Sequence, residues 1–594
     1  MVYLCNLQVI LSIYMVGVTK TKLSLCLGSY KKNHIFVIRY VFLCISQNIE
    51  FIMNNALYNF PVPQNETVLN YLKNSPERSE LEKELARQSA TQFDIPLIIG
   101  GKEILTGDTG EIRMPHQHSH LLGIYHKAGE KEIGKAIESA IKAHKTWSNM
   151  AWTIRASILL KAAELISTKY RATMNAATMF GQSKNIFQAE IDSVCETVDF
   201  LKYNSCFAGR IYEIQPRSTF NQLNRMEYRA LEGFILTISP FNFTSIASNL
   251  NMAPVMMGNT TVWKPATTSI LSNYYLMKIF LEAGLPEGVI NFIPGNGSLI
   301  GKTVLNSPDL AGIHFTGSNN TFNHLWSQTA ANLSKYKSYP RLVGETGGKD
   351  FIFVHASADP LEVAVNAIRG AFEYQGQKCS AASRMYVPKS LWPEIKSLLI
   401  DIASDIKMGD VMDPDNFMNA VIDKGSYDTI KSYIDYAKSS AEATIIAGGD
   451  CDDSEGYFIR PTIVEVTNPK HKLMEEEIFG PVLTVFVYED NKLEETITLC
   501  DSTSPYGLTG AVFARDRAEA SKICEKLQYA AGNFYINDKP TGAIVGLQPF
   551  GGSRASGTND KAGGEFNLVR WISPRTIKET FVPATEYKYP YMME

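Results

Sequence analysis

The chain has 594 residues, a formal net charge of −4 and a hydrophobic content of 45%. This length exceeds what a single hydrophobic core supports, so it predicts two or more domains. The nearly balanced charge provides no basic surface for nucleic acid. Nine scattered cysteines, without a C-x-x-C pair, favour reduced thiols over a disulfide framework or a metal site.

Residues 1–52 differ in composition from the rest of the chain. They are basic, and Glu50 is their first acidic residue. An acid-poor, basic start is typical of a mitochondrial transit peptide, although this one contains little arginine. Two alternatives remain open: Met53 is the true first residue, or the apolar residues 9–18 act as a signal segment or anchor. Beyond residue 52 the sequence contains no run of 18 or more apolar residues, so it predicts no membrane span there.

Amphipathic periodicity predicts several helices in the first third of the chain. Ser75 followed by Pro76 is typical of a helix start, and the charged stretch around it extends to residue 92. Apolar residues recur at helical spacing over residues 131–147 and again over 154–170. We interpret these faces as core-packing surfaces without chemistry.

Between residues 233 and 345, β-rich runs alternate with helical stretches. The runs are 234–238, 260–263, 289–293, 311–315 and 341–343, and amphipathic segments at 269–283 and 298–305 lie between them. This alternation predicts a parallel, doubly wound sheet with ligands at the carboxyl ends of its strands. The residues of chemical interest stand at such ends: Asn242, Lys264, Pro294 with Gly295, and Gly317 with Ser318.

A second α/β pattern begins after Gly348. It predicts a strand at 351–354, a helix at 360–374 and further strands at 482–487 and 510–513. Residues 210–230 are polar and interrupt the first pattern, so we expect a projecting arm. The aromatic tail from Phe566 onward is expected to pair with it.

Cys379 and Glu345 have the surroundings of a nucleophile and a general base. The cysteine lies in Gly376-Gln-Lys-Cys-Ser380, and the glutamate lies in Gly344-Glu-Thr-Gly-Gly348. A thiolate is a strong nucleophile, and a carboxylate can take a proton from water to release a covalent intermediate. A free cysteine is more often a small buried hydrophobic residue, so the pair alone leaves both interpretations open.

Eight motifs in one order resemble the aldehyde dehydrogenase superfamily, from about residue 66 to the C-terminus. Any one of them is weak evidence, but the ordered set is specific. They are Ile238-Ser-Pro-Phe-Asn-Phe243, Thr260-Thr-Val-Trp-Lys-Pro265, Pro294-Gly-Asn-Gly297, Phe315-Thr-Gly-Ser318, Gly344-Glu-Thr-Gly-Gly348, Gly376-Gln-Lys-Cys379, Glu477-Ile-Phe-Gly-Pro481 and Pro549-Phe-Gly-Gly552.

The resemblance implies an α/β fold with a Rossmann-type NAD-binding domain, an α/β catalytic domain and a small β oligomerisation arm. We expect the NAD-binding domain at 53–212 and 232–346 and the catalytic domain at 347–564. The arm and tail would be 213–231 and 565–594, which implies a homodimer or a higher homo-oligomer. The N-terminal extension, 1–52, would direct the chain to the mitochondrial matrix, or be absent from a cytoplasmic protein that starts at Met53.

The resemblance also implies a mechanism. Cys379 would attack the aldehyde carbon, and the Asn242 amide with the Cys379 backbone N–H would stabilise the oxyanion. Hydride transfer leaves a thioester, which water activated by Glu345 would hydrolyse. Without the resemblance, Asn242 would be interpreted as a turn residue after Pro240, and Glu345 as a solvated loop carboxylate.

The expected cofactor is NAD. Lys264 would bind the adenosine ribose, and Glu477 and Phe479 the nicotinamide ribose and ring. Strand–helix junctions would offer backbone N–H groups to the phosphates. Thr267 is neutral where several NAD-preferring members carry a glutamate, so the preference over NADP rests on the family. The expected cofactor residues are Ser239, Lys264, Pro294, Gly295, Gly317, Ser318, Asn319, Asn320, Thr321, Glu477 and Phe479.

Two stretches narrow the substrate within the superfamily. Residues 541–546 and 549–561 most resemble the subgroup that oxidises L-glutamate γ-semialdehyde, formed from Δ1-pyrroline-5-carboxylate, to L-glutamate, the second step of proline degradation. Ala543 stands where animal members often have serine, so one hydroxyl donor is missing. The expected roles are a carboxylate nest from Ser380, Gly542 and Ala543, and an aliphatic clamp from Phe243 and Phe550.

Three other functions remain as alternatives: a dehydrogenase for another ω-semialdehyde, a CoA-acylating dehydrogenase, and an inactive homologue that only binds. Glu345 argues against CoA acylation, which needs no hydrolytic base, and the intact Cys379 argues against inactivity.

Two further patterns receive no function. His116, His118 and His120 form an H-x-H-x-H run that we expect to be an exposed edge without metal. The glycine-rich residues 551–564 lack the Gly-Lys-Ser/Thr ending of a phosphate-binding P-loop. We expect a small-molecule substrate and no metal, nucleic-acid or membrane partner.

Overall fold

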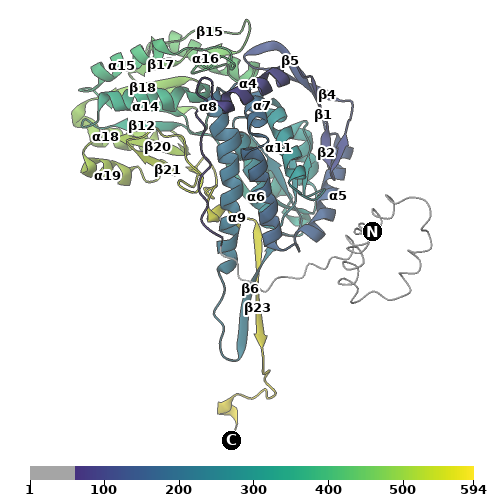
Figure 1. Ribbon diagram of the computed structural model, residues 1–594. Coiled ribbons are helices and arrows are strands. Elements are labelled where there is room, and N and C mark those ends of the chain that lie inside the picture. The colour runs from purple at the N-terminus through teal and green to yellow at the C-terminus, as the bar shows by residue number, and fades with distance from the viewer. Residues whose placement is uncertain (1–59, 594) are drawn as a thin grey trace, which may run out of the picture. The chain divides into compact units, whose positions relative to one another are not determined.

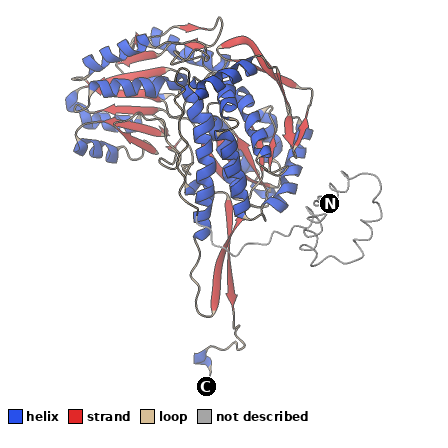
Figure 2. Cartoon of the chain, in the orientation of Figure 1, coloured by secondary structure: helices blue, strands red, loops and turns tan. Residues whose placement is uncertain are grey.

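A computed structural model describes residues 60–593, so the expectations for residues 1–52 lie outside the described part. Two seven-stranded sheets dominate this part. The first is built from strands within residues 97–345 and the second from strands within 350–536. Figure 1 follows the chain through both sheets, and Figure 2 separates the helices from the strands. Among the helices of residues 60–593, none has the length and apolar character needed to cross a bilayer.

The first sheet has the strand order β11-β10-β7-β8-β9-β2-β3. Its five strands from β7 to β11 pair in parallel, as the alternating pattern predicts, whereas β2 is antiparallel to both neighbours. The strands are β2 (Leu97–Ile99), β3 (Lys102–Ile104), β7 (Phe234–Ile238), β8 (Thr261–Lys264), β9 (Ile290–Phe292), β10 (Leu310–Thr316) and β11 (Arg341–Glu345).

Helices connect and cover these strands. α4 starts at Pro76 as predicted, because the Ser75 hydroxyl accepts the Arg78 backbone N–H at 3.3 Å and caps it. The other helices of this part are α5 (Glu130–Trp147), α6 (Trp152–Ser167), α7 (Arg171–Gln182), α8 (Ile186–Ala189), the π-helix η1 (Glu190–Glu196), α9 (Thr197–Glu213), α10 (Thr244–Met256), α11 (Ile270–Glu282), α12 (Gly297–Leu305) and α13 (Asn319–Ala331); α4 ends at Ser89.

The second sheet has the order β14-β17-β18-β13-β12-β20-β21, and only β14 is antiparallel. Its strands are β12 (Asp350–Val354), β13 (Ala382–Pro388), β14 (Ala443–Ala447), β17 (Thr462–Val466), β18 (Val482–Tyr488), β20 (Thr509–Phe513) and β21 (Asn533–Ile536). The helices around it are α14 (Pro360–Phe372), α15 (Trp392–Asp405), α16 (Lys424–Ser439), α17 (Lys472–Glu475), α18 (Leu493–Ser502) and α19 (Arg517–Lys526).

The predicted pairing of tail and arm is confirmed. β6 (Gln222–Ala230) and β23 (Ile572–Thr580) form an antiparallel ribbon from Ile572 opposite Ala230 to Thr580 opposite Gln222. Figure 1 shows the two strands next to each other, beyond the end of α9. The short helix α20 (Glu565–Val569) precedes β23. The remaining short pairs are β15 (Cys451–Asp452) with β16 (Phe458–Ile459) and β19 (Tyr506–Gly507) with β22 (Ser553–Arg554).

The expectation that the histidine run forms an exposed edge is wrong for its first member. β1 (Phe93–Ile95), β5 (Gln117–His126) and β4 (Thr109–Met114) form a small sheet, and the turn before β5 pairs with residues 455–457. This contact buries His116, which is 5% exposed and stacks on Phe180. His118 and His120 contact backbone carbonyl groups instead. Within residues 60–593, no cluster of three or more His, Cys, Asp or Glu residues is arranged to hold a metal ion.

Two glycine substitutions test the packing of the fold. In β20, a Cβ on Gly510 would lie 2.2 Å from the Phe351 ring, so Gly510→Ala should lower the free energy of unfolding by about 1–3 kcal/mol. In α5, a Cβ on Gly134 would meet no other side chain or distant backbone atom within 4 Å. Gly134→Ala should therefore raise the free energy of unfolding by about 0.5–1 kcal/mol. Denaturant unfolding of both variants checks these opposite signs, and equal midpoints would contradict this packing.

Candidate active site

The strand order of the first sheet creates a crevice. β7 lies between β8 and β10, so the chain winds away in one direction from β7 to β9 and in the other from β10 to β11. A doubly wound sheet binds its ligands at such a switch point, at the carboxyl ends of the strands. Asn242 follows β7, Gly317 follows β10 and Glu345 ends β11. The topology therefore brings together residues that the sequence separates.

Asn242 and the cysteine loop are in direct contact. The Asn242 side-chain amide donates a hydrogen bond to the Gln377 carbonyl at 3.0 Å, and both residues are buried. The loop bends sharply before this point, because Tyr374 and Gln375 adopt φ values of 51° and 56°. These left-handed conformations are costly for residues other than glycine and persist only when surrounding contacts hold them. The Asn242 amide, which is predicted to bind the oxyanion, thus contacts the cysteine loop at Gln377, two residues before Cys379.

The Cys379 thiol has a raised pKa. Burial is the main cause, and the carboxyl groups of Glu345, Asp350 and Glu477 add to it, while the Ser380 backbone N–H opposes it. Negative neighbours and a dry environment both disfavour a thiolate. The thiol is therefore protonated in this arrangement, and a base or a positive charge must act before it can attack an electrophile.

Glu345 has the environment of a general base. Burial raises its pKa to about 8; the ammonium of Lys561 opposes this rise, and the Asp560 carboxyl adds to it. Lys561 is held in place because its ammonium donates to the carbonyl groups of Gly532 and Gly551, at 2.8 and 2.9 Å. A base whose pKa lies near the operating pH transfers protons efficiently.

Lys264 carries a cation without a partner in the described residues. It ends β8, and burial lowers its pKa. A Cβ on Gly297 would lie 3.9 Å from the Lys264 side chain, so the N-terminus of α12 is close to it. α13 follows β10, which lies two strands from β8 in the sheet. The Ser318 hydroxyl caps α13 and accepts the Thr321 backbone N–H at 3.3 Å. An unpaired ammonium beside a helix N-terminus fits the hydroxyl groups and phosphates of a dinucleotide.

Glu477 and Phe479 share a cavity with Cys379. The other residues that line this cavity are Gly348, Gly376, Lys378, Ile478, Gly480 and residues 381–383. Burial raises the pKa of Glu477 to about 7, and its carboxyl accepts the Gly348 backbone N–H at 3.0 Å. Phe479 adopts a left-handed φ of 55° and packs edge-on against Phe241. The residues expected to hold the nicotinamide end therefore lie beside the nucleophile.

The other expected cofactor residues have structural contacts. The Ser239 hydroxyl accepts the Trp263 indole N–H at 3.0 Å, and the Pro294 carbonyl accepts the Ala128 N–H at 2.8 Å. Gly295 follows with φ of 154°. Asn319 donates to the Ala555 carbonyl at 2.8 Å, whereas Asn320 and Thr321 are exposed at the start of α13. All of them lie at or just beyond the carboxyl ends of β7, β9 and β10.

Two segments that carry expected substrate residues are in contact next to the cysteine. The Ser380 hydroxyl lies 2.8 Å from the Thr541 hydroxyl, which precedes Gly542 and Ala543. Gly542 has φ of 93°, a conformation that favours glycine. Phe550 is fixed by two hydrogen bonds to Ala562, each of 2.8 Å.

Phe243 is the remaining residue of the expected substrate set. Its ring lies beneath the Lys184 ammonium, 4.3 Å from the ring centroid.

Three contributors were missed from the sequence. Lys561 is the last residue of the stretch 549–561, but no local pattern distinguishes it. Lys184 and Asp192 form a buried ion pair of 2.6 Å next to Phe243. A lysine and an acid eight residues apart resemble many exposed pairs, so only their burial reveals them.

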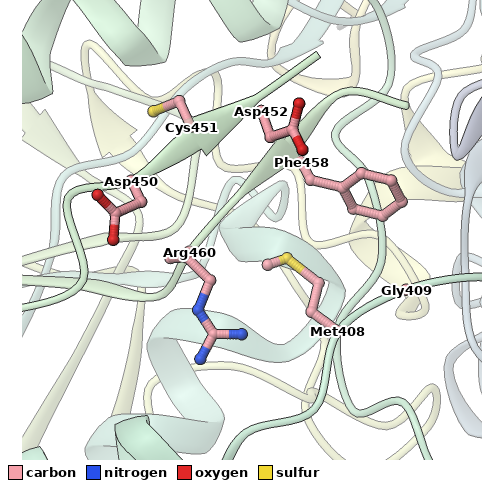
Figure 3. A pocket seen from close by; sticks show the side chains of 7 residues that line it. All are labelled: Met408, Gly409, Asp450, Cys451, Asp452, Phe458 and Arg460. Atoms are coloured by element: carbon pink, nitrogen blue, oxygen red, sulfur yellow. The ribbon is translucent and has the colours of Figure 1, made fainter. Parts of the chain in front are cut away.

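A separate surface hollow does not belong to this site. Figure 3 shows its lining residues, Met408, Gly409, Asp450, Cys451, Asp452, Phe458 and Arg460. Arg460 donates to the Ile406 carbonyl at 3.2 Å, which ties β16 and its flank to the end of α15. We assign this hollow no function.

Comparison with known proteins agrees with the geometry. Residues 106–577 match the profile described as "Aldehyde dehydrogenase family". The chain is 51% identical to "Delta-1-pyrroline-5-carboxylate dehydrogenase, mitochondrial" of Dictyostelium discoideum, over 91% of this chain and 97% of that one. It is 50% identical to the protein of the same name from Homo sapiens, over 89% and 94%.

A solved structure is similar as well. The Delta-pyrroline-5-carboxylate dehydrogenase from Mycobacterium tuberculosis, crystallised with bound NAD, superimposes with a TM-score of 0.88 at 47% identity. The match covers 91% of this chain and all of that one.

Replacing Glu345 tests the electrostatics around the thiol. Glu345→Gln removes one of the carboxylates that raise the pKa of Cys379, so the pH dependence of Cys379 alkylation by iodoacetamide should move to lower pH. The part of the alkylation that is lost in Cys379→Ala identifies the Cys379 signal, because Cys451 and Cys524 are also partly exposed thiols. A profile that stays in place or moves to higher pH would show that the carboxylate does not act on the thiol.

Proposed function

Because this chain belongs to the aldehyde dehydrogenase family, we propose that it oxidises L-glutamate γ-semialdehyde to L-glutamate with NAD. The semialdehyde forms from Δ1-pyrroline-5-carboxylate, and its oxidation is the second step of proline degradation. The names of the relatives and the NAD-bound neighbour support this proposal. The observation that carries it is the contact between Ser380 and Thr541, which brings Gly542 close to the half-buried, protonated Cys379.

Cys379 is the proposed nucleophile. Its sulfur attacks the aldehyde carbon after its proton is lost, which gives a thiohemiacetal. The negative oxygen then needs donors, and the Asn242 amide and the Cys379 backbone N–H are the proposed pair. Bound NAD would supply the hydride acceptor, and loss of hydride from the thiohemiacetal carbon would leave a thioester. Lys264, Glu477 and Phe479 are proposed to hold it beside the sulfur.

Glu345 is the proposed base for the second half of the reaction. It takes a proton from water, which attacks the thioester and releases the acid together with the free thiol. Because burial places the pKa of Glu345 at about 8, the ionised base accumulates as the pH rises towards and beyond this value. Deacylation should therefore accelerate from neutral to mildly alkaline pH.

Substrate selection is proposed to depend on the two ends of the molecule. The aldehyde reaches Cys379, while the α-carboxylate is held by Ser380 and the backbone N–H groups of Gly542 and Ala543. Phe243 and Phe550 would enclose the aliphatic carbons between these ends. Ala543 supplies no hydroxyl, which weakens the anchor and makes another ω-semialdehyde the second candidate substrate.

We also propose a homodimer or higher homo-oligomer in the mitochondrial matrix. β6 exposes Leu223, the turn before it exposes Phe220, and the tail beyond β23 exposes Tyr587, Tyr589 and Tyr591. Such surfaces are typical of subunit contacts. The relatives from Dictyostelium and human are named as mitochondrial, which supports the location.

The two halves of the mechanism can be separated by substitution. Cys379→Ala should abolish NADH formation while NAD still binds, and Glu345→Gln should release a single burst of NADH per site and then stall, because the thioester persists. Stopped-flow absorbance with Δ1-pyrroline-5-carboxylate and calorimetric NAD titration provide the measurements. Normal turnover by Glu345→Gln would remove this residue from its proposed role.

Ala543→Ser tests the carboxylate anchor. A new hydrogen bond to a charged group should lower KM for Δ1-pyrroline-5-carboxylate by about tenfold. Propanal has no carboxylate and serves as the control, so its KM should not change. If wild-type kcat/KM is higher for succinic semialdehyde than for pyrroline-5-carboxylate, the second candidate substrate replaces the first.

A further inference from the structure

A buried ion pair lies directly behind the two loops of the active site. The Lys184 ammonium and the Asp192 carboxylate are 2.6 Å apart, and their side chains are 1% and 0% exposed. Lys184 follows the end of α7, and Asp192 lies in the π-helix η1. Both side chains are buried, and neither lines the cavity beside Cys379.

Asp192 caps the helix that follows Asn242. α10 begins at Thr244 without a side-chain cap of its own, because its preceding residue is Phe243. The Asp192 carboxylate accepts the backbone N–H groups of Thr244 at 3.0 Å and Ser245 at 2.9 Å instead. A carboxylate at a helix N-terminus satisfies free donors and interacts favourably with the helix dipole. Asp192 thereby fixes the backbone two residues after Asn242.

Lys184 contacts both loops through aromatic rings. Its ammonium lies 4.3 Å from the centroid of the Phe243 ring and 4.5 Å from that of Tyr374. Phe243 is next to Asn242, and Tyr374 begins the left-handed bend that leads to Cys379. A desolvated ammonium over two ring faces is attracted by both.

The backbone beside Lys184 supports the same bend. The Gln375 side-chain amide donates to the Ser183 carbonyl at 3.0 Å and to the Ala420 carbonyl at 2.7 Å. Since Tyr374 and Gln375 both have positive φ, these contacts hold a conformation that the chain would otherwise leave.

We propose that Lys184 and Asp192 act together as positioning residues that fix the Asn242 loop relative to the Cys379 loop. The hydrogen bond from Asn242 to the Gln377 carbonyl is the contact they preserve. Without the ion pair, the amide and the Cys379 backbone N–H would no longer converge on one oxyanion. The kinetic part of this inference rests on the proposed aldehyde oxidation.

The test compares charge-removing variants at this pair with a matched control. Lys184→Met and Asp192→Asn should each lower kcat by about 10²-fold, the typical loss for one oxyanion donor, with KM for NAD unchanged. Lys184→Arg retains the charge and should recover part of kcat. The double variant removes both charges, so it should recover stability to unfolding over the single variants without recovering kcat.

Glu190→Gln is the control. Glu190 lies in the same π-helix and forms a buried ion pair with Arg171 at the start of α7, but it contacts Tyr71 and Asn175 rather than the loops. This variant should lose stability and keep its kcat per folded molecule. If Lys184→Met also keeps its kcat per folded molecule, the positioning role is overturned.

Two further readouts separate this proposal from the proposed substrate. Kinetics with propanal report on the loops even if glutamate semialdehyde is not the natural substrate. Alkylation of Cys379 by iodoacetamide needs no turnover, and Lys184→Met should react faster than wild type because its cysteine loop is released. Unchanged alkylation together with unchanged propanal kinetics would refute the positioning role, whereas failure with the semialdehyde alone would refute only the substrate.

Discussion

The short connection at residues 346–349 is the constraint on which the site depends. It joins β11, the last strand of the first sheet, to β12, an inner strand of the second. Glu345 ends one strand and Asp350 begins the next, so both sheets meet where the base is placed. The Asp350 carboxyl accepts the Thr509 backbone N–H at 2.6 Å, which ties the junction to β20. Parallel pairing on either side then sets where Asn242 and Cys379 lie.

Burial at this junction shifts several ionisable groups toward neutrality. Desolvation raises the pKa of Glu345 and of Asp350 to about 8, raises that of Glu477 to about 7, and lowers that of Lys349 to about 7. Each of these groups can exchange a proton at small energetic cost near neutral pH. The same dry environment suppresses the Cys379 thiolate, so the nucleophile becomes reactive only when charge or proton transfer accompanies the attack.

Much of the fold could be predicted because its signals are local. The strands from Phe234 to Glu345 are short, mostly apolar runs, as buried parallel strands require, and the helix start at Ser75 depends on its own hydroxyl. His116 was misjudged because its burial comes from residues 455–457, far along the chain. The roles of Lys184 and Asp192 could not be predicted for the same reason. The rings that contact Lys184, those of Phe243 and Tyr374, and the backbone N–H groups of Thr244 and Ser245 that donate to Asp192 are distant in sequence.

The sequence by itself determined the chemistry that this protein can perform. Thiol, carboxylate, amide and ammonium groups stand in ordered motifs, and their reactivity is a property of the residue types. Only the tertiary structure decided how those groups behave. It brought Asn242 to the cysteine loop, buried Glu345 until its pKa rose to about 8, and left Lys264 without a partner among the described residues. Desolvation and proximity depend on neighbours from other elements, which no local pattern encodes.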